Sequence, residues 1–188
     1  MNKGQACWSR PLKNQVGEVR MKQGRNGSTT FLIVDAQSVK NTDSARQKGY
    51  DAGKKVSGIK RHIAFDTQGL PHAIAVTTAE VTDRKGALEA LARCRANLRA
   101  VGNVLVDGGY TGEPFAQAVA DTLAGATVQI AKRSDLHSFA VMPKRWVVER
   151  SFAWIEKCRR LWKNCERKLN TSLQFIHLAF LALLLRRS

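Results

Sequence analysis

Two short apolar runs, each followed by an aspartate, constrain the fold of this chain most strongly. Residues 29–34 precede Asp35, and residues 101–106 precede Asp107. Runs of this length and composition are typical of buried strands. If the two strands are neighbours in one sheet, both carboxylates meet at the same sheet edge, where open α/β sheets place their sites. The two runs therefore predict an α/β fold with paired carboxylates.

The rest of the chain alternates between strand and helix patterns. Thr82 and Asn170 are expected to cap two of the helices. We expect a loop at 41–58, a hairpin of strands at 59–66 and 72–78, helices at 83–98 and 113–123, a strand at 126–131, and a C-terminal helical pair at 143–167 and 171–185. This order predicts an α/β domain with a mixed sheet, its first three strands antiparallel, and flanking helices.

The charge of the chain points to a polyanionic partner. Thirty-one Lys and Arg oppose 15 Asp and Glu, which gives a net charge of +16. The excess lies mainly in residues 1–30 and 143–188. Nucleic acid is the first expectation and an anionic membrane the second. A basic RNA- or ribosome-binding module is an alternative that charge alone leaves open.

The two ends of the chain differ in character. Residues 1–29 are rich in Gly, Asn, Gln and Lys without helical or strand periodicity, so we expect a basic flexible lead-in before a single domain at 30–188. The longest apolar run, Leu173–Leu185, is shorter than the ~20 residues that a membrane span needs, so no membrane association is expected. The four cysteines lack zinc spacing and are typical of reduced cytoplasmic thiols.

Paired carboxylates suit metal-dependent phosphodiester chemistry. Two Mg²⁺ ions ~3.5–4 Å apart activate the attacking oxygen and stabilise the leaving oxygen, and Mg²⁺ prefers oxygen ligands. Taken singly, an aspartate after a strand is more often a turn or cap residue. Glu149 lies opposite the apolar stripe of its helix. The pattern is compatible with a solvated face on which Arg145 and Glu149 form a pair, and equally with a basic face that lies along DNA.

Four motifs together resemble a known family. They are VDAQSVK at 34–40; Gly53, Lys54, Lys55, Gly58, Lys60, Arg61 and His62; LVDGGYTG at 105–112; and RWVVERSFAW at 145–154. In this order they resemble the DDE transposases of the insertion sequence five group. The resemblance extends over about residues 30–188 and includes every segment with a strong strand or helix pattern.

The resemblance implies a fold, a cofactor and a reaction. It implies an RNase H-like DDE catalytic domain at 30–188 in which Asp35, Asp107 and Glu149 are the catalytic residues and hold two Mg²⁺ ions, with Mn²⁺ able to substitute. The implied reaction is cleavage of DNA at insertion-sequence ends, followed by attack of the freed 3′-hydroxyl on target DNA. For Glu149, the resemblance favours a metal ligand over a solvated face.

Double-stranded DNA, both element ends and target, is the implied partner, in the nucleoid of a bacterial cytoplasm. Arg145 lies one turn before Glu149, where its planar guanidinium suits a phosphate. The expected DNA-binding residues are Lys54, Lys55, Lys60, Arg61, Arg145 and Arg160. The apolar helix at 171–185 also suggests a homodimer assembled on paired DNA ends.

The family usually carries a helical DNA-binding region before the first aspartate, and residues 1–30 are not expected to supply one. A product of an upstream reading frame is therefore an expected partner. The alternative function is a truncated, non-catalytic DNA-binding protein that regulates or inhibits transposition.

Overall fold

A mixed sheet forms the centre of the computed structural model, which describes residues 9–131 and 145–186. Its described strands are β1 (Phe31–Lys40), β2 (Gly49–Asp51), β3 (Val56–Phe65), β4 (Pro71–Thr78), β5 (Asn103–Val106) and β6 (Thr127–Ile130). The order is β2-β3-β1-β5-β6, and β4 pairs with β3. Strands β1, β3 and β4 are antiparallel neighbours, whereas β1, β5 and β6 are parallel. The predicted mixed sheet with an antiparallel opening is confirmed.

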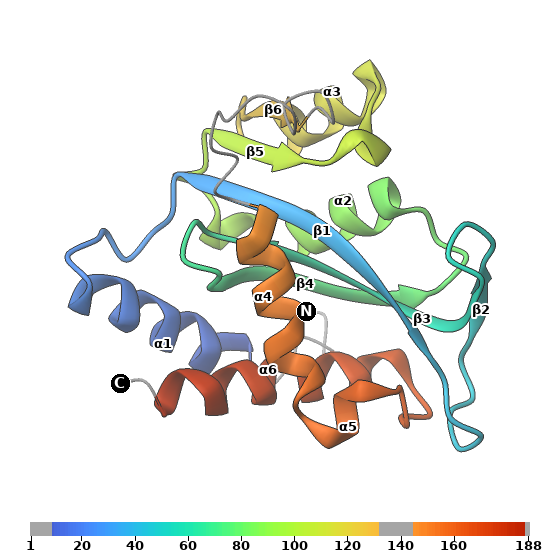
Figure 1. The fold of residues 1–188 in the computed structure, drawn as a ribbon. Helices are drawn as coiled ribbons and strands as arrows, with labels where there is room; N and C mark the ends of the chain where they lie inside the picture. Colours follow the sequence, from blue (N-terminus) through green and yellow to red (C-terminus); the bar gives the residue numbers. More distant parts are fainter. Residues whose placement is uncertain (1–8, 132–144, 187–188) are drawn as a thin grey trace.

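Helices cover both faces of this sheet (Figure 1). Helices α2 (Asp83–Cys94) and α3 (Glu113–Thr122) pack on one face, and α1 (Ser9–Lys22), α4 (Arg145–Glu156), α5 (Arg159–Trp162) and α6 (Leu169–Leu185) pack on the other. Short 3₁₀ turns, η1 (Arg95–Asn97) and η2 (Gly108–Tyr110), follow α2 and β5. Each face has its own cluster of buried apolar side chains, so the sheet lies between two cores.

Strand β1 is longer than the sequence pattern predicts. It was expected to end at Asp35 but continues to Lys40, because its antiparallel pairing with β3 extends as far as Lys40 opposite Gly58. Its parallel pairing with β5 covers only Phe31 to Ile33. Asp35 therefore lies inside β1, just beyond the point where the parallel pairing stops. The loop expected at 41–58 is likewise wrong in part, since it contains β2 and the start of β3.

The C-terminal helices depart from the prediction in two ways. The helix expected over 143–167 breaks after Glu156, where α4 ends. Beyond α5, the Asn164 N–H donates to the Lys40 carbonyl at 2.9 Å. The backbone there pairs with the end of β1 instead of continuing a helix. The expected Asn170 cap is also wrong, because α6 begins at Leu169. The Leu169 N–H donates to Gln47 Oε1 at 2.8 Å, so a distant side chain satisfies this helix end.

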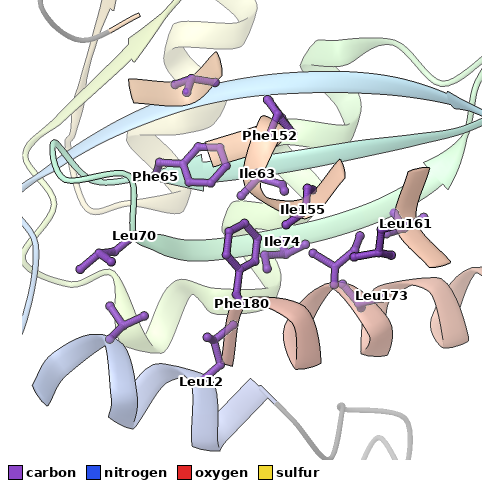
Figure 2. Close-up of a cluster of buried hydrophobic side chains, with 14 of the residues drawn as sticks. Leu12, Ile63, Phe65, Leu70, Ile74, Phe152, Ile155, Leu161, Leu173 and Phe180 are labelled. Carbon is purple, nitrogen blue, oxygen red and sulfur yellow. The ribbon is translucent and has the colours of Figure 1, made fainter. Parts of the chain in front are cut away.

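Helix α1 occupies the middle of the expected flexible lead-in at 1–29, so that prediction is wrong for Ser9–Lys22. Leu12, Val16 and Val19 recur at helical spacing and are buried. They belong to the same apolar cluster as α6, and Figure 2 shows Leu12 pointing into that cluster below Phe180. Much of the α6 surface that suggested a second subunit is thus covered within the chain. Across the described ranges, no helix combines the length and apolar character needed to cross a membrane.

Candidate active site

Asp35 and Asp107 occupy equivalent positions in two neighbouring strands. In the parallel pairing of β1 with β5, Phe31 lies opposite Asn103 and Ile33 opposite Leu105. The same register continued by two residues brings Asp35 opposite Asp107. Neighbouring strands lie about 4.8 Å apart, and alternation points both side chains to the sheet face that α4 covers. The structure thus brings together the two aspartates that the sequence pattern singled out.

The backbone around each aspartate holds its carboxylate in place. Asp35 Oδ1 accepts the Ala36 N–H at 2.7 Å. Asp107 Oδ1 accepts the Gly109 N–H at 2.9 Å and so caps the 3₁₀ turn η2. One oxygen of each carboxylate accepts a hydrogen bond from a nearby backbone N–H. Both side chains are therefore held in a defined orientation.

Burial, together with neighbouring negative charge, makes the ionisation of Asp35 costly. Burial is the main cause that raises the pKa of Asp35 to about 6, and the negative charges of Asp107 and Asp83 raise it further. The Ala36 N–H and the positive charge of Lys54 act in the opposite direction. A cation bound between the aspartates would remove much of this repulsion. The site is therefore an acidic position at which a cation is electrostatically favoured.

A buried ion-pair network lies beside Asp35. Lys60 Nζ lies 2.9 Å from Asp83 Oδ1 and 3.1 Å from Asp51 Oδ2, and it donates to the Val81 carbonyl at 3.0 Å. Lys54 Nζ donates to the carbonyl of Ala36 at 3.1 Å and keeps a half-exposed side chain. The network joins β2, β3 and the start of α2 behind the aspartates.

The expectation that Lys60 and Arg61 contact DNA is corrected by this structure. Lys60 is 5% and Arg61 1% exposed. Arg61 donates to the Leu161 carbonyl at 2.5 Å and lies within 3.3 Å of Gln37 Oε1, so its guanidinium links β3 to α5 and β1. Both cations are buried because carboxylates or carbonyls satisfy them inside the fold. They stabilise the sheet that carries the aspartates.

His62, in the same motif, has a packing role as well. Its ring is fully buried, Nε2 lies 2.9 Å from Thr77 Oγ1, and burial lowers the pKa of His62 to about 4. A Cβ added at Gly86 of α2 would lie 2.1 Å from the ring. The glycine, which lies at the end of the first turn of α2, therefore lets this helix approach β3 closely.

Glu149 lies on the helix that covers the Asp35 side of β1. It is exposed, while Val147 and Val148 before it are buried. Seven residues later, Glu156 Oε1 accepts a hydrogen bond from Gln37 of β1 at 2.6 Å, and Gln37 lies on the same strand face as Asp35. Within residues 9–131 and 145–186, however, no three His, Cys, Asp or Glu side chains are grouped to hold a metal ion.

Comparisons with known proteins identify the family of the chain. The family described as "Transposase DDE domain" matches residues 26–185. The chain belongs to the DDE transposase family. It is 36% identical over 133 residues to a protein assigned as a transposase for insertion sequence element IS402 of Burkholderia cepacia, covering 67% of this chain and 60% of that protein. It is 30% identical over 132 residues to the counterpart for IS6501 of Brucella ovis, covering 68% of this chain and 98% of that one. The chain therefore spans 60% of the length of the first of these relatives.

Solved structures support the fold. A chain of the simian T-cell lymphotropic virus intasome aligns with a TM-score of 0.52 at 15% identity, covering 81% of this DDE transposase chain and 47% of its own length. The catalytic core domain of BIV integrase aligns with a TM-score of 0.51 at 8% identity, with coverage of 81% and 83%. The expected RNase H-like fold of integrases and transposases is confirmed.

The remaining basic residues predicted to bind DNA lie apart from one another in this DDE transposase. Lys55 is exposed in the turn between β2 and β3, where its φ is +53°. Arg160 is on α5 and pairs with Glu166 Oε1 at 2.5 Å. Arg145 begins α4, and its side chain lies outside the described residues. Lys54 is a predicted residue that combines an exposed side chain with a charge that acts on Asp35.

Two residues near the aspartates were not among the predicted site residues. Asp83 is the first residue of α2, and its charge acts on Asp35. Tyr110 is 1% exposed, and the charges of Asp35, Asp83 and Asp107 all act on its hydroxyl. The available signals were an acid just after the predicted Thr82 cap and a tyrosine in the motif that contains Asp107.

Proposed function

We propose that this DDE transposase cleaves DNA at insertion-sequence ends and joins the freed end to target DNA, with Asp35, Asp107 and Glu149 as its metal-binding carboxylates. The observations that carry the proposal are the register of β1 with β5, which pairs Ile33 with Leu105 two residues before the two aspartates, and the charge of Asp107, which acts on Asp35. Family membership supports the same assignment, because the match over residues 26–185 includes all three carboxylates.

The donor set around the two aspartates fits Mg²⁺ or Mn²⁺. Both residues offer carboxylate oxygens, the ligands that these ions prefer, and the charge of Asp107 already opposes the ionisation of Asp35. The chemistry that two such ions supply when bound is activation of the attacking oxygen and stabilisation of the leaving oxygen. We propose Glu149 as the third ligand, since it extends from the helix that covers this side of β1.

Residues around the carboxylates have roles in binding DNA. Lys54 is half exposed beside Asp35, so its ammonium is placed to pair with a phosphate near the reacting bond. Lys55 in the same turn, together with Arg145 and Arg160 farther along the chain, would extend the contact to neighbouring phosphates. The net charge of +16 supports double-stranded DNA as the substrate.

Calorimetric titration with Mn²⁺ tests the carboxylate assignment. The wild-type chain is compared with Asp107→Asn, Glu149→Gln and a control, Glu113→Gln, at an exposed position on α3. We expect saturable binding in the wild type and the control, none in Asp107→Asn, and weaker binding in Glu149→Gln. Nicking of supercoiled plasmid in Mn²⁺ should follow the same order. A folded wild type that binds no Mn²⁺ would contradict the proposal.

The second candidate function is a DNA-binding protein without cleavage activity. The observation that favours it is the absence of a three-ligand group within residues 9–131 and 145–186. Nicking by the wild type separates the two functions, and Glu149→Gln tests the role of Glu149 within the first. If this change leaves Mn²⁺ affinity and nicking unaltered, Glu149 is not a ligand. DNA binding without any nicking by the wild type would establish the second function.

A further inference from the structure

Tyr110 is held rigidly beside the candidate active site. It ends the 3₁₀ turn η2 that Asp107 caps, and its N–H donates to the Asp107 carbonyl at 3.2 Å. Its ring packs on Phe115 of α3, with ring centroids 5.5 Å apart and planes tilted by 54°. The side chain is 1% exposed, so the hydroxyl has little freedom to seek a partner elsewhere.

The Tyr110 hydroxyl is not explained by packing alone. It is buried and has no hydrogen-bond partner within residues 9–131 and 145–186. Burying a hydroxyl in this way costs free energy that phenylalanine would avoid, so a tyrosine with a purely structural role should find an acceptor inside the core. The backbone bond of Tyr110 to Asp107 fixes the residue at the turn that carries this carboxylate, and the charges of Asp35, Asp83 and Asp107 all act on the hydroxyl.

The chemistry of the hydroxyl suits these neighbours. Burial, followed by the three negative charges, raises the pKa of Tyr110, so the phenol stays protonated and can donate. Carboxylate oxygens and the waters that carboxylates hold are acceptors. Ligands of bound metals are commonly oriented by such outer hydrogen bonds.

We propose that Tyr110 is a positioning residue whose hydroxyl donates to an oxygen of the metal site, either a carboxylate oxygen of Asp35 or Asp107 or a water that they hold. This orients the two aspartates toward a divalent cation. The inference rests on the proposed function, because it takes Asp35 and Asp107 as metal ligands.

The test is a Mn²⁺ titration of Tyr110→Phe beside wild type, with thermal unfolding of the same metal-free samples. Tyr50→Phe is the matched control, because Tyr50 on β2 is 56% exposed. We expect Tyr110→Phe to raise the dissociation constant for Mn²⁺ about tenfold, with an unchanged or higher melting temperature. Tyr50→Phe should alter neither quantity.

A second variant separates the hydroxyl from its packing. Phe115→Leu disturbs the contact with the Tyr110 ring but keeps the hydroxyl. The inference is overturned if Phe115→Leu weakens Mn²⁺ binding as much as Tyr110→Phe does, or if Tyr110→Phe binds Mn²⁺ like the wild type. In the latter case the proposed function still stands, provided that Asp107→Asn has lost binding. A wild type that binds no Mn²⁺ overturns both.

Discussion

The two faces of the sheet are built from different parts of the chain. Helices α2 and α3 follow the strands that they cover, between β4 and β6, whereas α1 and α4 to α6 come from the two ends of the described chain (Figure 1). Asp35 and Asp107 depend on the sheet and on α2, through the network of Lys60 with Asp83. Glu149 depends on the docking of α4 on the other face. The two aspartates therefore depend on the pairing of strands within the sheet, while the third carboxylate depends on a helix that docks onto it.

The two cores also differ in the size of their side chains. The sheet face toward α2 presents small residues, which allow a close approach of the helix: Ala64, Ala73 and Ala75 from the sheet and Ala87 and Ala90 from α2. On the opposite face, Phe65 meets Phe152 and Phe180 edge to face, with ring centroids 5.5 and 6.1 Å apart (Figure 2). We infer that the α2 face tolerates added volume poorly and that the opposite face is sensitive to lost contacts.

The largest expected effect comes from breaking the buried contact that holds α1. Arg20 of α1 pairs with Asp66, which is fully buried and also lies 3.1 Å from His72 Nε2. Arg20→Met removes one of the two basic partners of the buried Asp66 charge, so we expect a loss of about 3–5 kcal/mol in the free energy of unfolding. Denaturation by urea measures it.

Arg25→Met is the control for this change, because Arg25 is exposed and bonds only to Thr67 Oγ1 at 3.1 Å among the contacts described. It should alter the unfolding free energy by less than about 0.5 kcal/mol. The double variant Arg20→Met with Asp66→Asn should recover part of the loss, since the unpaired charge is removed. A loss below about 1 kcal/mol for Arg20→Met would show that α1 is not docked through this pair.

On the sheet face toward α2, one added methyl group should lower the free energy of unfolding. Gly86→Ala places a Cβ 2.1 Å from the His62 ring, so α2 or the ring must shift. We expect a loss of about 1–3 kcal/mol in unfolding free energy. His62→Ala in the same chain should remove most of the additional cost of Gly86→Ala, which a double-mutant cycle measures. Equal costs of Gly86→Ala with and without His62 would mean that the close approach of α2 does not depend on this contact.

Removing the charge of Asp35 should stabilise the fold above pH 6. The pKa of Asp35 is about 6 in the folded chain and 3.8 ordinarily, so the folded state holds a proton more tightly. The stability contribution of Asp35 therefore falls as pH rises from about 4 to 6 and stays low above that range. Asp35→Asn should be more stable than wild type by about 1–2 kcal/mol at pH 8.

The measurement is the difference in unfolding free energy between the two chains across pH, which cancels groups that titrate in both. Near pH 4 the difference should become small. A difference that does not change with pH would show that Asp35 ionises as freely in the folded chain as in the unfolded one. The effect sharpens the comparison of the two faces, because it would show that the sheet they share carries a carboxylate whose ionisation is made unfavourable mainly by burial.

Short sequence patterns predicted the strands and the helix cap whose signals lie within a few neighbouring residues. The apolar runs before Asp35 and Asp107 identified two strands whose pairing brings the aspartates together. Thr82 was recognised as a cap because its side chain bonds to its own helix, at Lys85. Each of these features depends on residues close in sequence, or on a strand end that open α/β sheets use generally.

The parts that were mispredicted depend on partners far away in the chain. The three apolar residues of α1 form a useful face only against α6, so they did not stand out in a polar segment. Lys60 and Arg61 were expected at the surface, as Lys and Arg usually are. Their burial depends on Asp51, Asp83 and the Leu161 carbonyl, and a single sequence does not show that these partners converge.

The smallest expected effects come from the helix ends, where the same contrast recurs. Thr82 Oγ1 accepts the Lys85 N–H at 3.3 Å within α2, whereas the first N–H of α6 donates to Gln47, 122 positions away, at 2.8 Å. We expect Thr82→Ala and Gln47→Ala each to lower the free energy of unfolding by about 1 kcal/mol or less.

Hydrogen exchange should distinguish the effects of the two substitutions. Thr82→Ala should loosen only the first turn of α2, while Gln47→Ala should speed exchange both in the loop around residue 47 and at the start of α6. If Gln47→Ala affects only its own loop, α6 is held by its apolar face alone. The sheet face covered by α1 and α4 to α6 would then need fewer specific contacts than the structure indicates.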